Sequence, residues 1–385
     1  MKKLILSVLL TGVLLLSACS STGEGQIIDM TESNDISSLD DLTKSGVKIV
    51  KIVSGSGFEV LLTDYNQVYF QGGNQNLVLG SSFPDIISDP IQIPFDEEIV
   101  NIYAGDTNIA CVGKSNKIHY IGCDMLYIDN IMEETKRIYP PEVLGTIEGI
   151  KDITMGGFTC HVLTHSGEVY AFGANVNATL GIEKDVVSEF TLIPFDEKID
   201  SISEAAGGLM FVAESGNLYG CGLIFGEKDE KTIIPKKLMS GIKQSSVTHT
   251  TGFALTNEGE VYVIGSNYRG EAGVSTEETA IREFTKVEFD EPIEALYSAK
   301  YFHTFAKSKS GKLYGWGSPI ENSNNSTKPV DLMIDGFSFE HMSISGEDFY
   351  TSDKDGNWFF YDNKSNQLLG DEPTTPTPFV LEVSE

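Results

Sequence analysis

Pairs of neighbouring carboxylates recur along the chain and are the first candidates for chemistry. The same step, a phenylalanine followed by an aspartate and a glutamate, stands at Phe95-Asp96-Glu97, Phe195-Asp196-Glu197 and Phe289-Asp290-Glu291. Calcium prefers oxygen ligands, but it takes about six to eight of them converging on one ion. A single step in an exposed turn offers roughly two. We therefore expect solvated turn charges, with the phenylalanine anchoring a strand end, and predict no metal site.

Recognisable catalytic motifs are missing from the sequence. It has no G-x-S-x-G elbow, no H-E-x-x-H pair and no phosphate-binding G-x-x-x-x-G-K-[ST] loop. Carboxylates are so frequent that no pair is singled out for acid–base catalysis. Six histidines are scattered along the chain, at His119, His161, His165, His249, His303 and His341. We expect them to be packed or hydrogen-bonded, and we predict no catalytic residue, no cofactor and no enzymatic activity.

Cys19 is the side chain for which the sequence predicts a covalent modification. It follows a positively charged start and an apolar run, residues 4–16, a layout typical of a secretory signal and shorter than a membrane span. The motif Leu16-Ser17-Ala18-Cys19 resembles a bacterial lipoprotein box. The resemblance implies that residues 1–18 are a signal peptide, that cleavage falls before Cys19, and that its thiol carries a diacylglyceryl group. The alternative is a plain signal peptide followed by an incidental cysteine.

Residues 19–46 are expected to form an acidic, flexible tether. Ser20–Gly25 is small and polar, as flexible linkers are. Ser37–Leu42 could instead cap one short helical turn. Several acyl chains, palmitate among them, hold a protein stably at a membrane where a single chain binds weakly. The N-terminus thus predicts a bacterial membrane protein, lipid-anchored on the extracytoplasmic face.

The charge balance excludes nucleic acid as a partner. The 385 residues include 56 acidic and 27 basic side chains, for a formal charge of −29, and an acidic surface repels a phosphate backbone. Only Arg137, Arg269 and Arg282 are arginines. The excess negative charge keeps such a domain soluble, and we expect a monomer.

From residue 47 onward the chain repeats itself. A polar turn recurs every 43 to 52 residues, at Asn66, Asn116, Gly167, Gly216, Gly259, Gly311 and Gly356. An apolar residue follows two positions after each turn, and a glycine follows six positions after all but the last, where Asp362 stands. A repeat of this length is typical of solenoids and propellers. Each unit contains four short β-branched or aromatic runs, so the sequence predicts an all-β fold, a seven-bladed β-propeller of four-stranded antiparallel blades over residues 47–385.

One stretch shows the repeat most clearly and carries a family resemblance. Gly156–Asn175, closed by Leu180-Gly181, resembles a regulator-of-chromosome-condensation repeat, with its paired glycines, its turn glycine and its Val-Tyr pair. The resemblance covers residues 47–385, although units two, four and six lose the Asn…Leu-Gly loop. It implies the propeller fold, and some bacterial members of this family are secreted, among them a β-lactamase inhibitor that binds its target with one face of the ring. Nucleotide exchange on a small GTPase, the role of eukaryotic members, is disfavoured by export and by the acidic surface.

The C-terminus is expected to close the ring. In many propellers the two chain ends share one blade, and Pro378–Val383 has the Pro-flanked shape of the strands that end the other units. We therefore predict that Pro378–Val383 pairs within the sheet that contains residues 47–72.

The four cysteines beyond Cys19 are expected to be buried thiols. Cys111, Cys160 and Cys221 fall inside predicted strands, where free cysteine behaves as a small hydrophobe. Cys123 completes the set. Because the protein is predicted to be exported, one or two disulfides are the alternative.

Three loops carry apolar residues where polar turns are expected, and they are the candidate partner-binding site. The residues are Met125, Leu126, Tyr127, Leu223, Ile224, Phe225, Tyr268 and Arg269. Exposed aromatic, aliphatic and Arg side chains are typical of protein interfaces. Alternatively, these loops fold back and extend a blade. We predict a lipid-anchored extracytoplasmic propeller that binds another protein; the alternative is an enzyme or carbohydrate-binding protein that uses the central pore.

Overall fold

The computed structural model describes residues 47–74, 78–126, 137–225, 232–276, 278–298, 303–317, 326–332, 341–345, 348–353, 355, 358–361 and 377–378. All of them belong to one compact unit, Ser37–Glu385. The predicted signal peptide, the tether and Cys19 lie outside these residues. In the part of the chain that is described, no helix has the length and apolar character needed to cross a membrane.

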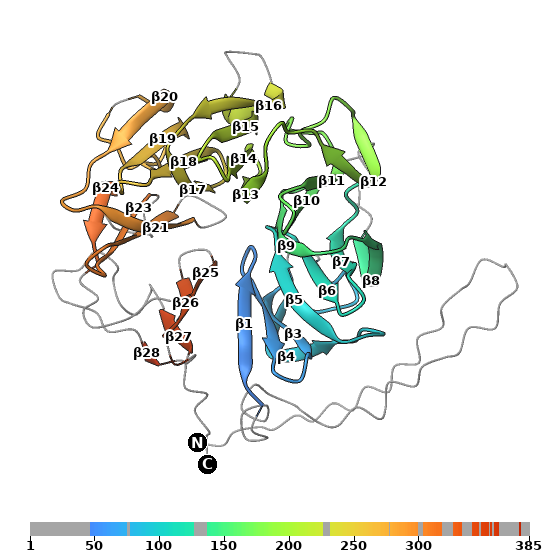
Figure 1. Ribbon diagram of the computed structural model, residues 1–385. Coiled ribbons are helices and arrows are strands. Elements are labelled where there is room, and N and C mark those ends of the chain that lie inside the picture. The colour runs from blue at the N-terminus through green and yellow to red at the C-terminus, as the bar shows by residue number, and fades with distance from the viewer. Residues whose placement is uncertain are drawn as a thin grey trace, which may run out of the picture. The chain divides into compact units, whose positions relative to one another are not determined.

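The chain forms seven four-stranded antiparallel sheets arranged as blades around a ring, which confirms the predicted architecture (Figure 1). The first blade consists of β1 (Ile49–Ser54), β2 (Phe58–Thr63), β3 (Val68–Gly73) and β4 (Ile86–Ile93). The second consists of β5 (Ile99–Ala104), β6 (Asn108–Gly113), β7 (Lys117–Cys123) and β8 (Arg137–Thr146). The third consists of β9 (Ile150–Met155), β10 (Thr159–Thr164), β11 (Val169–Ala174) and β12 (Val186–Ile193).

The remaining four blades continue the same order. The fourth consists of β13 (Ile199–Ala205), β14 (Gly208–Ala213), β15 (Leu218–Gly222) and β16 (Thr232–Met239), with a short 3-10 helix, η2 (Leu223–Phe225), after β15. The fifth has β17 (Ile242–Val247), β18 (Thr251–Thr256), β19 (Val261–Ser266) and β20 (Ala280–Val287). The sixth has β21 (Ile293–Ser298), β22 (His303–Ser308), β23 (Leu313–Gly317) and β24 (Ser326–Asp331). The seventh has β25 (His341–Ser345), β26 (Asp348–Ser352), β27 (Trp358–Tyr361) and β28 (Thr377–Pro378).

The repeated turn makes these blades possible. It joins the second strand of a blade to the third, and it requires a left-handed backbone: φ is +59° at Asn66 and +84° at Gly167, values that asparagine and glycine tolerate best. The second strand lies between two neighbours and is covered on both faces; every residue of β2 and of β10 is buried. The apolar faces of successive blades pack on each other, which is how a repeat fold acquires its core.

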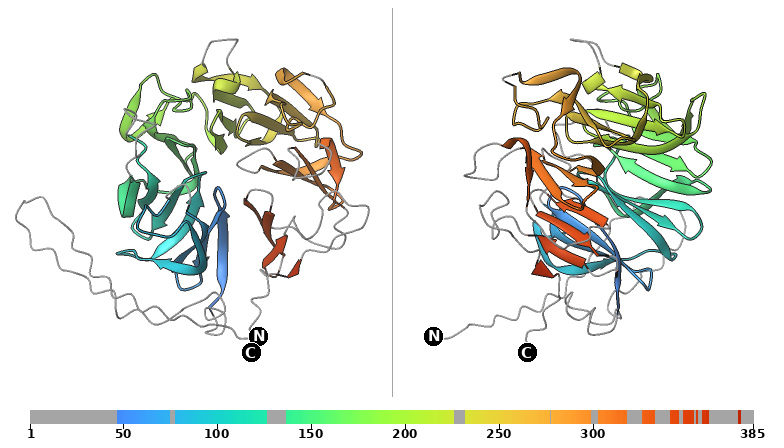
Figure 2. Two further views of the ribbon diagram at one scale, coloured as in Figure 1. Left: turned by 180° about the vertical axis from the view of Figure 1, so that it is seen from behind. Right: turned by 60° about the vertical axis from the view of Figure 1, so that its left-hand side comes forward.

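The ring closes in a way that differs from the prediction. The first sheet is complete with β1 to β4, all from residues 49–93, while β28 pairs with β27 in the seventh blade. The predicted pairing of Pro378–Val383 with the first sheet is therefore wrong at Pro378; residues 379–383 lie outside the described part. Closure comes instead from blade packing: β1 lies beside β25 (Figures 1 and 2), and Oγ of Ser343 donates a hydrogen bond to Oγ of Ser54 at 2.8 Å.

The four cysteines in the blades are free and buried, as predicted. Cys111, Cys160 and Cys221 stand in β6, β10 and β15. Burial raises the pKa of each of these thiols far above its ordinary value, so they stay protonated and unreactive at neutral pH. Their role is therefore to pack.

Candidate functional site

Two of the three predicted loops meet in one groove between the fourth and fifth blades. The groove has a volume of about 1050 Å³, and residues of β16 and β20 line it. These are the last strands of the two sheets, and Figure 1 shows both in the upper part of the ring. Leu223, Ile224 and Phe225 in η2 line it from one side, and Tyr268 lines it from the loop after β19. Residues 45 positions apart in sequence thus share one concave surface.

The local sequence of the fourth blade builds the first wall. In the first and third blades an Asn…Leu-Gly loop follows the third strand. This loop is missing after β15, so the chain turns at once into η2. The amide of Ile224 donates to the carbonyl of Gly207 at 3.2 Å, and Oγ1 of Thr232 donates to the carbonyl of Phe225 at 2.9 Å. These two hydrogen bonds hold η2 against the blade and point it towards β19.

The Asn…Gly loop of the fifth blade builds the second wall. Oδ1 of Asn267 accepts a hydrogen bond from the amide of Ala272 at 3.2 Å. The same bond, from the residue five positions later, occurs at Asn74 and at Asn175 in the first and third blades. Because the asparagine fixes both ends of the loop, the side chain of Tyr268 stands out from it and is 78% exposed.

The groove combines an apolar floor with an exposed apolar rim. Phe225 and Ile264 are buried at its base, and Leu238 and Phe284 are half-buried beside them. On the rim, Leu223 is 44% exposed. A concave surface with exposed aromatic and aliphatic side chains is typical of protein-binding sites.

Three cations, which the sequence analysis did not single out, stand on the groove walls. Lys236 and Lys237 are exposed on β16, and Arg282 is exposed on β20. Glu283 is the one carboxylate among the described residues that line the groove. The adjacent lysines, in a chain with only 27 basic residues against 56 acidic ones, were the sequence signal that could have pointed to a cationic surface here.

The other residues predicted for the partner-binding site differ in burial and in location. Met125 is buried in the core of the second blade, so the alternative in which the loop folds back is correct for that residue. Leu126 beside it is partly exposed, and Tyr127 lies outside the described residues. Phe225 belongs to the core as well as to the groove floor. Arg269 is exposed next to Tyr268 but does not line the groove.

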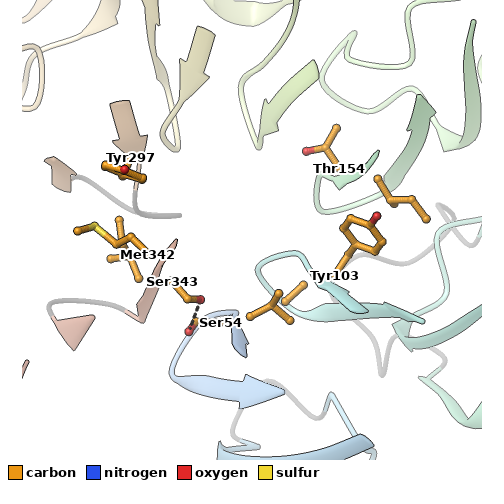
Figure 3. A pocket seen from close by; sticks show the side chains of 10 residues that line it. Ser54, Tyr103, Thr154, Tyr297, Met342 and Ser343 are labelled. Atoms are coloured by element: carbon orange, nitrogen blue, oxygen red, sulfur yellow. Dashed lines mark hydrogen bonds between the residues drawn. The ribbon is translucent and has the colours of Figure 1, made fainter. Parts of the chain in front are cut away.

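The central pore offers a second concavity, of about 230 Å³ (Figure 3). Its lining comes from the inner strands of five blades and includes Ser54, Thr154, Ser343 and the rings of Tyr103 and Tyr297. Among the described residues that line it, none is a carboxylate, an imidazole or a lysine.

The repeated acidic steps fasten one blade to the next. The backbone amide and Oγ of Ser115 each donate to the carboxylate of Glu97 at 2.8 Å, and Nε2 of His119 lies 3.0 Å from it. The ring of Phe95 packs edge-on against that of His119, with 5.4 Å between ring centroids. Phe95 therefore anchors the strand end, as predicted. The prediction that Glu97 is a solvated turn charge is wrong, because Ser115 and His119 hold its carboxylate.

The two later steps repeat this arrangement. Asn217 and Tyr219 donate to Oε1 of Glu197 at 2.8 and 2.5 Å, and Ser310 donates to Glu291 at 2.8 Å. The rings of Phe195 and Phe289 pack edge-on against Tyr219 and Tyr314, with centroid separations of 5.5 and 5.3 Å. The steps thus join the first blade to the second, the third to the fourth, and the fifth to the sixth.

One of these steps has the composition of a cation site. Ligand atoms of Asp96, Glu97 and His119 lie within 4.8 Å of one another. The oxygens of Glu97, however, already accept hydrogen bonds from Ser115 and face His119, and calcium takes about six to eight oxygens. The arrangement is accounted for as a structural contact between blades.

No protein-family model matches the chain. It is 25% identical over 302 residues to the ultraviolet-B receptor UVR8 of Arabidopsis thaliana, covering 72% of this chain and 67% of that protein. It is 23% identical over 263 residues to the human regulator of chromosome condensation, covering 59% of this chain and 62% of the relative. The chain is a homologue of the regulator-of-chromosome-condensation proteins.

A solved structure from this family has the same fold. Prp20p of Saccharomyces cerevisiae superposes with a TM-score of 0.62 at 17% identity, covering 74% of this chain and 76% of that one. The alignment with the human family member spans about three fifths of that protein's length. These similarities agree with the propeller fold of this chain. The groove between the fourth and fifth blades has to be interpreted from its own residues.

Proposed function

We propose that this protein is a lipid-anchored, extracytoplasmic binding module whose fourth and fifth blades capture another protein. The observation that carries the proposal is the single groove formed by Leu223 and Tyr268. Prp20p, a propeller of the same fold, binds Gsp1p and histones, and a crystal structure holds Kap60 bound to it. Another propeller of this fold therefore binds proteins.

The location rests on the N-terminal sequence. The apolar run that ends in Leu16-Ser17-Ala18-Cys19 supports export followed by acylation of Cys19. A long polar tether would let the propeller stand off the membrane. The strongly acidic composition supports the same arrangement, because an acidic domain is repelled by an anionic bilayer surface.

The proposal is tested by photo-crosslinking on intact cells. A photoreactive phenylalanine at position 268 is expected to capture a specific protein. The matched control is position 65 in the first blade, where Tyr65 is also an exposed tyrosine, at 64%. The captured band should weaken in a chain that also carries Leu223→Ala and persist with Leu192→Ala, which removes an equally exposed leucine (46%) from the third blade. Capture of the same proteins from both positions, or of none, would contradict the proposal.

A further inference from the structure

The charge of the groove walls is opposite to that of the chain as a whole. The protein has a formal charge of −29, yet the described residues that line the groove include Lys236, Lys237 and Arg282 against Glu283 alone. One of only three arginines in the chain stands here. A local excess of cations in an acidic protein selects for negatively charged groups.

Two of these cations have no ion-pair partner among the residues that the structure describes. Several lysines elsewhere are paired within the protein: Nζ of Lys114 lies 2.6 Å from Glu98, and Nζ of Lys286 lies 2.9 Å from Glu260. Lys237 has an electrostatic interaction with Glu197. Lys236 and Arg282 form no ion pair with any other residue that the structure describes. Their charges are therefore available to a bound molecule.

The shape of the groove suits an extended chain. Its walls are β16 and β20, each the outermost strand of its sheet, so each has one edge that pairs with no strand of its own blade. Leu223 and Tyr268 present apolar surface on the rim, above the buried Phe225. An extended peptide places side chains alternately on two sides, so an apolar residue can enter the groove while its neighbours meet the cationic walls.

From these features we infer that the groove binds an acidic segment of a protein partner. An aromatic or aliphatic side chain of the segment packs between Leu223 and Tyr268. Its neighbouring carboxylates pair with Lys236 and with Arg282, whose guanidinium can hold a carboxylate through two parallel hydrogen bonds. This inference rests on the proposed function, because it specifies which chemistry the same groove selects.

The test uses two fluorescent peptides and the whole mature protein. One peptide has a central phenylalanine flanked by glutamates, and its match has glutamine in place of every glutamate. Fluorescence anisotropy is expected to show binding of the acidic peptide alone, weakening as salt rises from about 50 to about 300 mM. The double variant Lys236→Glu/Arg282→Glu should weaken binding by about tenfold or more. Lys184→Glu, which reverses an exposed charge on the third blade, should leave it unchanged.

Each other result overturns the inference in a recognisable way. Equal binding of both peptides, binding of neither, or full binding by the double variant would show that charge does not select the ligand. Binding to phosphatidylglycerol vesicles that is lost in the double variant, without peptide binding, would assign the cations to a membrane surface. If position 268 still captures a protein in the crosslinking experiment, any of these outcomes leaves the proposed function standing and removes only the acidic segment.

Discussion

Glu204 in the fourth blade and His161 in the third form a buried pair across the blade interface. Nδ1 of His161 lies 2.8 Å from Oε2 of Glu204, and both side chains are fully buried. Oγ1 of Thr159 donates to the other oxygen of the same carboxylate at 2.5 Å. A carboxylate withdrawn from water needs such partners, because an unpaired buried charge costs several kcal/mol. The pair therefore fixes how the third blade packs on the fourth.

Breaking this pair is expected to destabilise the ring. We predict that His161→Phe, which keeps a ring of similar size, lowers the free energy of unfolding by about 3–5 kcal/mol, since Glu204 would stay buried without the imidazole. The control is Glu98→Gln, which removes the exposed pair with Lys114 and should cost less than about 1 kcal/mol. Urea unfolding measures both, and equal losses would contradict the role given to the buried pair.

Glu97 is expected to make the protein sensitive to acid. The pKa of Glu97 is lowered from 4.5 to about 2, mainly by the hydrogen bond from the backbone amide of Ser115 and next by the hydrogen bond with the side chain of His119. Because the folded-state pKa is below that of the unfolded chain, the stabilisation by Glu97 is complete above about pH 4.5 and is lost as the pH falls towards about 2.

Glu97→Gln should therefore flatten the dependence of the free energy of unfolding on pH within this window. Glu189→Gln, which removes an exposed carboxylate that makes no side-chain hydrogen bond in the described part of the chain, should keep the slope of the parent. Unfolding curves recorded between about pH 5 and about pH 2 give the slopes. A parental slope in the Glu97 variant would show that the carboxylate does not hold the blades together.

The contact between the first and last blades can be tested with an engineered disulfide. Ser54 and Ser343 have their Oγ atoms 2.8 Å apart, as do Ser203 and Ser245 between the fourth and fifth blades. We predict that both cysteine pairs form on oxidation. The bond at 54 and 343 closes a loop of 289 positions rather than 42, so it should add about 1.7 kcal/mol more stability. A pair at 54 and 343 that stays reduced while the other forms would argue against the closed ring.

Cys19 is expected to be the membrane anchor. Replacement by serine removes the thiol that accepts the diacylglyceryl group, so Cys19→Ser should move the exported protein from the membrane fraction into the soluble fraction. Detergent phase partitioning followed by mass spectrometry of the N-terminal peptide reads out the change. The four blade cysteines are buried and serve as the internal control, since labelling at Cys111 should not occur in the folded protein. An unchanged membrane fraction would mean that another feature anchors the chain.

The blade architecture was predictable because one blade is encoded locally. Each turn, such as those at Asn66 and Gly167, needs a residue that tolerates positive φ, so the period of seven turns is visible in the sequence. The closure was not predictable in the same way. The first unit already contains its own fourth strand, β4, and thus leaves no place for Pro378, which pairs in the seventh blade instead.

The groove depends on contacts between blades, and the sequence pattern carries little information about these. The composition of the loops at Leu223 and Tyr268 showed that they carry exposed apolar residues. It did not show that the two loops share one surface. Burial of Met125 and Phe225 arises from packing against neighbouring strands. Arg282 stands in a strand whose alternation only shows that its side chain faces solvent.

The affinity of the captured partner for purified variants tests the central claim most directly. Calorimetric titration should show that Leu223→Ala/Tyr268→Ala weakens binding by about a hundredfold, while its melting temperature stays that of the parent because both side chains are exposed. Leu192→Ala/Tyr65→Ala should bind as the parent does. A partner that binds the groove variant with parental affinity would place its binding site elsewhere on the ring and contradict the account.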